Sequence, residues 1–124
     1  METHGFSETE WAAAKAEAKS ILVAHAKMRG MIPYSELVAN LKSVRLGARE
    51  EGLFRLLDEI SEEEDAAGRG MLSVVVVHKV GDMQPGKGFF ELAKRLGRNT
   101  SDILKCWVEE LHKVHAHWSK KSAV

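Results

Sequence analysis

The predicted fold is decided by one stretch of sequence, MLSVVVVHKV at residues 71–80. Its four consecutive valines are β-branched, and β-branched side chains pack well on the pleated surface of a sheet. The stretch therefore predicts a long strand, and because apolar side chains would point to both faces, we expect cover on both sides. Upstream, Pro33 disfavours helix at Ile32, so residues 31–34 are predicted to be a short extended segment that is well placed to pair with this strand.

Helical patterns surround these two segments. Ser7 and Glu10 form a capping-box sequence, which predicts a helix to about Met28 with Gly30 as its terminator. Apolar residues at helical spacing predict four more helices. They are a helix capped by Ser35 and interrupted at Gly47, one from about Ala48 to Ile60, one at Phe89–Leu96 ended by Gly97, and one that starts within Asn99–Asp102 and runs to about Trp118. Residues 61–70 predict a frayed helix end or a loop, and residues 81–88 predict a glycine-rich loop.

Composition limits the class of protein. A length of 124 residues predicts a single domain over residues 1–124. The 18 basic and 18 acidic side chains balance, which lowers the expectation of a protein held to nucleic acid by its overall field. Cys106 is the only cysteine, so no internal disulfide and no cysteine-based zinc site is expected. No signal peptide and no membrane-spanning stretch is visible, and we expect a cytoplasmic protein without membrane contact.

The expected elements follow the order helix, short strand, helix, helix, strand, wing and two C-terminal helices, an α+β fold that is mostly helical. Over roughly residues 8–90 this order resembles the winged helix-turn-helix superfamily, and the resemblance implies a DNA-binding scaffold. Residues 32–37 (IPYSEL) and 76–80 (VVHKV) are also similar to the C-terminal domain of the DNA alkyltransferase family. Val77 occupies that family's nucleophilic cysteine position, so alkyl transfer is not expected. Residues 70–97 resemble small bacterial proteins of uncharacterised function.

One motif in the glycine-rich loop invites a nucleotide-binding interpretation. Gly81-x-x-x-x-Gly86-Lys87-Gly88 has the spacing of a phosphate-binding loop between a strand and a helix. However, Gly88 stands where a serine or threonine would bind magnesium, and Pro85 removes one backbone amide from the phosphate cradle. We interpret the segment as a wing or glycine-rich connection. A looser anion site, formed by Lys87 and the start of the next helix, stays open.

Glu109, His112 and His115 lie three residues apart and could share one helix face, which is a spacing that metal ligands use. A di-metal site would need a second such pair on a facing helix, and none is visible. We therefore favour a solvated polar face. No serine, histidine and aspartate set is arranged in a recognisable turn either. The sequence predicts no catalytic residue, no metal, no cofactor and no enzymatic activity.

The distribution of charge is the main functional signal. Residues 50–65 hold eight acidic side chains and one arginine, Arg55, which would repel phosphates from the predicted third helix. Among the charged residues of 78–98, five are basic and two are acidic. If nucleic acid is bound, we expect phosphate contacts from the wing and the following helix, to which Arg45 and Arg49 could add, with little base reading. The predicted contacts are Arg45, Arg49, Lys79, Lys87, Lys94 and Arg98.

Two hypotheses remain for a non-catalytic binding module. The first is winged-helix-type binding of double-stranded DNA through these phosphate contacts. The second is a protein-interaction module, in which the acidic third helix faces a basic partner and the amphipathic terminal helices pair in a homodimer. Trp11, Trp107 and Trp118 would anchor such an interface if they were exposed. A continuous positive face beside the wing would favour the first hypothesis, and an exposed apolar stripe on the terminal helices the second.

Overall fold

The computed structural model of the chain describes residues 2–3, 6–42, 51–78 and 86–122. It is mostly helical, with a small amount of strand, as predicted. The helices are α1 (Glu8–Lys27), α2 (Tyr34–Asn40), α3 (Glu51–Ala66), α4 (Lys87–Arg95) and α5 (Ile103–Ser122), and a 3₁₀ turn, η1, covers Leu72–Val75. The strands are β1 (Glu2–Thr3), β2 (Phe6–Ser7), β3 (Ile32–Pro33) and β4 (Val76–Val77).

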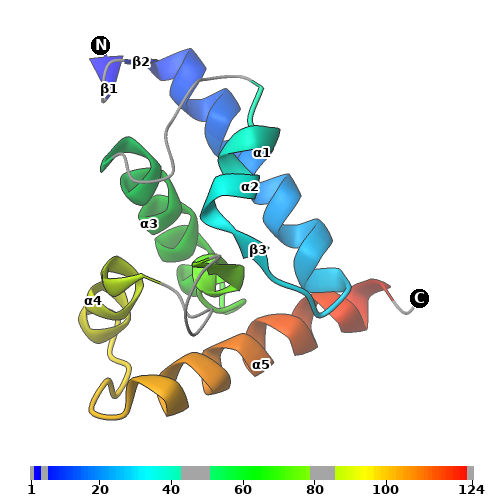
Figure 1. The fold of residues 1–124 in the computed structure, drawn as a ribbon, viewed down its shortest axis with the longest axis vertical. Helices are drawn as coiled ribbons and strands as arrows, with labels where there is room; N and C mark the ends of the chain where they lie inside the picture. Colours follow the sequence, from blue (N-terminus) through cyan, green and yellow to red (C-terminus); the bar gives the residue numbers. More distant parts are fainter. Residues whose placement is uncertain (1, 4–5, 43–50, 79–85, 123–124) are drawn as a thin grey trace.

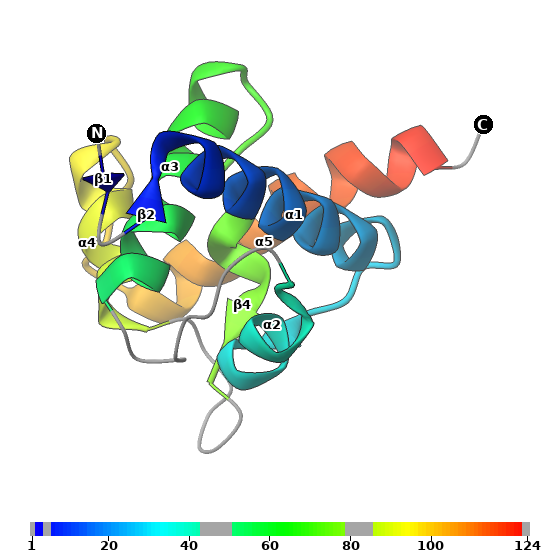
Figure 2. The ribbon, with the colours of Figure 1, turned by 90° about the horizontal axis from the view of Figure 1, so that it is seen from above.

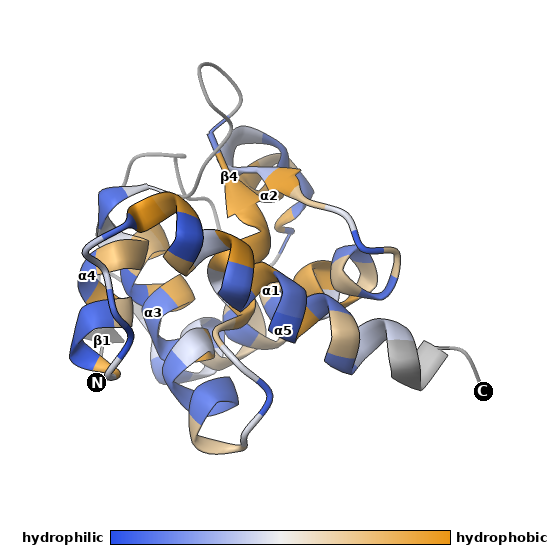
Figure 3. Cartoon of the chain, turned by 90° about the horizontal axis from the view of Figure 1, so that it is seen from below, coloured by the Kyte–Doolittle hydropathy of each residue, from blue (hydrophilic) through white to orange (hydrophobic). Residues whose placement is uncertain are grey.

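The segment around η1 forms the centre of the molecule. Helices α1, α3 and α5 all contact η1. Helix α5 runs along the base of the view in Figure 1, and α1 packs on it and crosses over it in Figure 2. Helix α4 packs on α3. Every residue from Met71 to Val77 is buried, and the hydropathy colouring marks β4 as hydrophobic (Figure 3). The core is therefore built by helices around one short apolar segment.

The prediction of a long strand at residues 71–80 is wrong for most of the residues that the structure describes there. Only Val76–Val77 is a strand, and it pairs in parallel with Ile32–Pro33. The predicted pairing of these two segments is therefore confirmed, but it extends over two residues on each side. The preceding residues form η1 because side chains satisfy their backbone: Met71 N donates to Glu110 (2.7 Å) and Ser73 N to Ser61 Oγ (3.0 Å). A buried backbone supplied with such partners does not need a sheet.

The start of α1 is confirmed in detail. Ser7 Oγ accepts from Glu10 N (3.1 Å), and Glu10 Oε1 accepts from Ser7 N (2.9 Å), which completes the capping box. At the C-terminal end of α1, the residue with a left-handed backbone conformation is Arg29, with φ 54°, and not the predicted terminator Gly30. Arg29 N donates to Ala26 O and Gly30 N to His25 O, the two bonds of a Schellman motif.

Three predicted helix boundaries need correction. Helix α2 begins at Tyr34 with Pro33 as its N-cap, so Ser35 does not cap it. Helix α3 continues to Ala66 instead of ending at Ile60, because Ser61 and Glu64 are buried and extend its inner face. Helix α4 begins at Lys87, two residues before the predicted start. Residues 43–50, which include the predicted start of α3, and most of the predicted wing lie outside the described residues.

The C-terminal helix is confirmed, but its inner face differs from the prediction. Asp102 Oδ1 accepts from Lys105 N (3.1 Å) at the start of α5, and the helix runs four residues beyond Trp118. The predicted apolar stripe was Ile103, Leu104, Trp107, Val108, Leu111, Val114 and Trp118. Of these only Val114 is fully buried, whereas Cys106 and Glu110 occupy inner positions. None of the helices in the described ranges has the length and apolar character to cross a membrane.

Candidate functional site

The predicted phosphate contacts do not gather on one described surface. Arg45, Arg49 and Lys79 lie outside the described residues. Lys87 and Lys94 are exposed on α4, and their separation of seven residues places them on the same face. Glu91 lies between them, with Oε1 3.9 Å from Lys87 Nζ. This face of α4 therefore presents two cations separated by one carboxylate.

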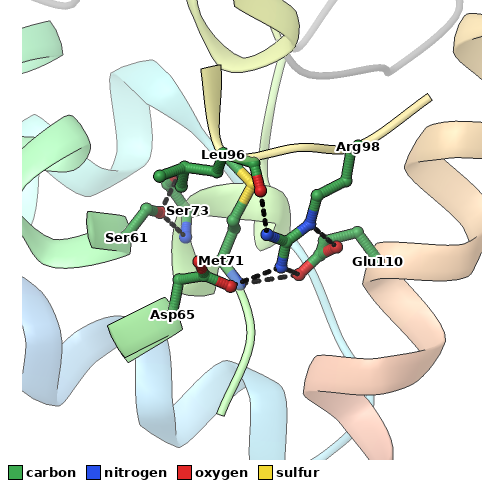
Figure 4. Close-up of polar contacts among 7 residues, drawn as sticks. All are labelled: Ser61, Asp65, Met71, Ser73, Leu96, Arg98 and Glu110. Carbon is green, nitrogen blue, oxygen red and sulfur yellow. Dashed lines mark hydrogen bonds and ion pairs between the residues drawn. The ribbon is translucent and has the colours of Figure 1, made fainter. Parts of the chain in front are cut away.

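The sixth predicted contact, Arg98, is part of an internal ion-pair cluster (Figure 4). Its guanidinium donates to Asp65 Oδ1 (2.5 Å), to both oxygens of Glu110 (3.0 and 3.1 Å) and to Leu96 O (3.2 Å). The Arg98 side chain is 19% exposed. The hydrogen bonds that Arg98 donates to Asp65 and Glu110 raise the pKa of Arg98, and the one that Asp65 accepts lowers the pKa of Asp65. The charge of Arg98 is thus balanced inside the fold, between α3 and α5.

The same cluster holds the central segment in place. Glu110 Oε2, which pairs with Arg98, also accepts from Met71 N at the entry to η1. Beside it, Ser61 Oγ donates to Ser73 Oγ (2.6 Å) and accepts from Ser73 N (Figure 4). Cys106 lies buried on the same helix as Glu110, and burial raises the pKa of its thiol, which disfavours the reactive thiolate. These contacts therefore hold η1 against α3 and α5.

The acidity of α3 is also largely balanced within the molecule. Lys15 pairs with Glu59 (3.1 Å) and Glu63 (2.7 Å), and Glu64 pairs with Lys19 (3.1 Å) and Arg69 (2.6 Å). Asp65 pairs with Arg98, and Asp58 lies 3.7 Å from Arg95. Among the α3 side chains that the structure describes, Glu62 is the one carboxylate outside these pairs. An acidic surface offered to a basic partner is therefore much weaker than the sequence alone indicated.

The candidate metal ligands on α5 are not brought together with further ligands. His115 is buried and its Nε2 lies 3.0 Å from Gly30 O, whereas Glu109 and His112 are exposed. Burial lowers the pKa of His115, although the hydrogen bond to Gly30 opposes this. Within the ranges that the structure describes, no group of three histidine, cysteine or acidic side chains could hold a metal ion.

An apolar surface lies on the first half of α5. Ile103, Leu104 and Val108 are 48%, 52% and 37% exposed, and Trp107 and Leu111 beside them are half-buried. We call these five residues the α5 patch. The Trp107 indole donates to Val74 O (3.3 Å), so its ring is anchored while part of it stays accessible. Trp11, by contrast, is buried and donates to Glu59 (2.9 Å).

A cavity of about 520 Å³ lies between α3, α4 and the start of α2. Tyr34 lines this cavity and contacts three other lining residues. Its hydroxyl accepts from Gly86 N (2.9 Å), the Phe54 ring packs edge-on at 6.0 Å, and the His78 ring lies at 5.2 Å. The phosphate-loop motif pointed to one edge of this cavity, Gly86–Gly88. The motif does not predict that the other walls lie beside it. The lining residues are Tyr34, Phe54, Arg55, Leu57, Asp58, Ser73, His78, Gly86, Lys87, Gly88, Phe89 and Glu91.

Comparisons of the chain with protein-family models, with curated proteins and with solved structures found no match.

Proposed function

We propose that this protein is a non-catalytic protein-interaction module that self-associates through the α5 patch. The supporting observation is the exposure of Ile103, Leu104 and Val108 on a helix whose adjoining face packs in the core. Single exposed apolar side chains are common, but a contiguous group marks an interaction surface. Of the two hypotheses drawn from the sequence, this exposure on a terminal helix favours the second.

A second copy of the chain is the partner that fits this surface. In an antiparallel pair of α5 helices with the two-fold axis at Trp107, residues at equal distances before and after Trp107 face each other across the axis. Ile103 then faces Leu111 of the second copy. The stripe is therefore complementary to itself in apolar character.

The patch is small, so the expected dimer is weak. A stable interface usually buries about 800 Å² on each partner, which the α5 patch alone does not supply. We expect association in the micromolar range, and the oligomeric state should depend on protein concentration.

Sedimentation velocity across micromolar to millimolar protein tests this proposal. Val108→Glu should give a monomer throughout, because it places a charge in the centre of the interface. Ala116→Glu is the matched control, since it adds the same charge at an exposed position of the same helix. Circular dichroism establishes that both variants are folded. A monomeric wild-type protein, or equal loss of dimer in both variants, would overturn the proposal.

A pair of substitutions tests the antiparallel arrangement itself. Ile103→Lys should weaken the dimer by placing a charge opposite Leu111 of the second copy. The double variant Ile103→Lys/Leu111→Glu should associate more strongly than Ile103→Lys alone, because the two substituted positions then carry opposite charges across the axis. Equal association of the single and double variants, in a protein that is dimeric as the wild type, would contradict the placement of the axis at Trp107.

Binding of duplex DNA is a second candidate, supported by the exposed Lys87 and Lys94 on one face of α4 and by the winged-helix resemblance. Fluorescence anisotropy of a labelled random duplex, at low and at physiological salt, tests it. Binding that falls steeply with salt and is lost in a folded Lys87→Glu/Lys94→Glu variant would support this candidate. Absence of binding at low salt would reject it without affecting the α5 proposal.

A further inference from the structure

The cavity around Tyr34 has the size of a small-molecule site. Its volume of about 520 Å³ lies within the range of about 300–1,000 Å³ that such sites occupy. Tyr34 is 8% exposed and forms the apolar floor together with Phe89, which is 6% exposed. Phe54 is 39% exposed. An aromatic ring that is accessible beside a cavity offers a stacking surface for a planar ligand.

The rim of the cavity carries both signs of charge. Arg55 and Asp58 come from one face of α3, and Lys87 and Glu91 come from α4 on the opposite side. The internal pairings of these groups are loose, with 3.7 Å between Arg95 and Asp58 and 3.9 Å between Lys87 and Glu91. Both distances exceed a direct hydrogen bond. The charged groups therefore keep hydrogen-bonding capacity for a ligand.

Hydrogen-bonding groups with fixed positions lie between the rings and the rim. The Tyr34 hydroxyl accepts from Gly86 N, so its own proton is available to donate. The Asp58 side chain is 21% exposed and can accept from an amino group. Burial raises the pKa of Asp58, although Arg95 and Arg55 oppose this, so a hydrogen-bond donor from a ligand would stabilise its ionised form.

We infer that this cavity binds a nucleoside monophosphate. The base stacks on Phe54 and donates from its amino group to the Asp58 carboxylate, and the phosphate is held by Lys87 and Arg55. A planar ring, an amino donor and an anion are combined in this class of ligand, and the cavity presents a partner for each. The site is formed by α2, α3 and α4 and is independent of the α5 patch.

Isothermal titration calorimetry with four probes tests the inference. They are adenosine monophosphate, guanosine monophosphate, adenosine, which lacks the phosphate, and inorganic phosphate, which lacks the ring. We expect at least one monophosphate to bind about tenfold or more tightly than inorganic phosphate, from stacking of the base. Equal affinity for inorganic phosphate, or no binding of either monophosphate at millimolar concentration, would overturn it.

Variants assign each contact. Phe54→Ala should weaken binding of the monophosphate and of adenosine, and Lys87→Gln should weaken the monophosphate alone. Asp58→Asn should change the preference between the two bases, since it replaces an acceptor-only group by one that also donates. Lys94→Gln is the matched control, because it removes an exposed lysine from the same helix outside the cavity. Unchanged affinity in Phe54→Ala, with the fold verified by circular dichroism, would contradict the stacking role.

Discussion

The Arg98 guanidinium donates hydrogen bonds to Asp65 Oδ1 (2.5 Å) and to Glu110 Oε1 (3.0 Å), so this one side chain links the end of α3 to the middle of α5. Glu110 is 5% exposed and Asp65 is part-buried. Arg98→Ala would leave both carboxylates without their cation. We expect the free energy of unfolding to fall by about 2–4 kcal/mol, measured by urea denaturation.

Lys94→Ala is the control for this prediction. Lys94 is exposed on α4, and its loss should change the free energy of unfolding by less than about 0.5 kcal/mol. Equal effects of the two substitutions would show that the Arg98 cluster does not stabilise the fold.

Gly70 should be sensitive to the smallest substitution. Its φ is +91°, and a Cβ would lie 3.0 Å from Glu110 Oε2 and 3.1 Å from Val114 Cγ2. Gly70→Ala should therefore combine backbone strain with crowding and cost about 2–3 kcal/mol. Gly97 has φ +92° with nothing within 4 Å, so Gly97→Ala should cost only about 1 kcal/mol. Urea denaturation gives the free energy of unfolding of each variant, and the difference between the two variants is the cost of crowding at Gly70. Equal losses of free energy would show that α5 adjusts to the added methyl group.

The hydrogen bonds of Ser61 give a third prediction. Ser61→Ala removes the acceptor for Ser73 N and the partner of the Ser73 hydroxyl, both buried. The expected loss is about 1–3 kcal/mol in thermal or urea unfolding. Ser35→Ala provides the comparison, because Ser35 is exposed and does not cap α2. A loss in Ser35→Ala as large as that in Ser61→Ala would mean that Ser35 caps α2 in solution.

His115 should make stability depend on pH in a range above that of the carboxylates. Burial lowers its pKa in the folded protein below the ordinary value of 6.5, so the folded state binds fewer protons than the unfolded state. The stability that this contributes is present above pH of about 6.5 and is lost as the pH falls toward the folded pKa. Urea denaturation from neutral to mildly acidic pH should show a positive slope that His115→Gln reduces. Identical slopes in both proteins would exclude His115 as the source.

Local patterns predicted the helices well because their signals lie within a few residues. The Ser7–Glu10 capping box, the end of α4 near Gly97 and the start of α5 at Asp102 all depend on neighbours in the sequence. The central segment was mispredicted because its β-branched composition favours a strand, whereas tertiary contacts decide its conformation. Its backbone partners, Ser61 and Glu110, lie 12 and 39 residues away from the groups that they bind.

Contacts between residues far apart in the sequence also explain why the candidate sites were not predicted. The exposed edge of α5 could not be located, because Cys106 and the polar Glu110 take inner positions that apolar spacing assigns to other residues. Arg98 was grouped with surface cations, since nothing close to it in the sequence marks Asp65 as its partner. The cavity collects residues from α2, α3, η1 and α4 and from His78 after β4, and Gly86–Gly88 is the part of it that belongs to a phosphate-loop motif.

The burial of residues 71–77 determines what happens to the protein when it unfolds. This apolar segment has high β propensity, no charge and no proline or glycine, which is the composition of strands that aggregate between chains. The fold keeps it apart from other chains by winding part of it into η1 and surrounding it with α1, α3 and α5. Substitutions that detach α5 would expose a segment ready to form intermolecular sheet. Loss of the native state should therefore lead to insoluble protein rather than to a soluble unfolded chain.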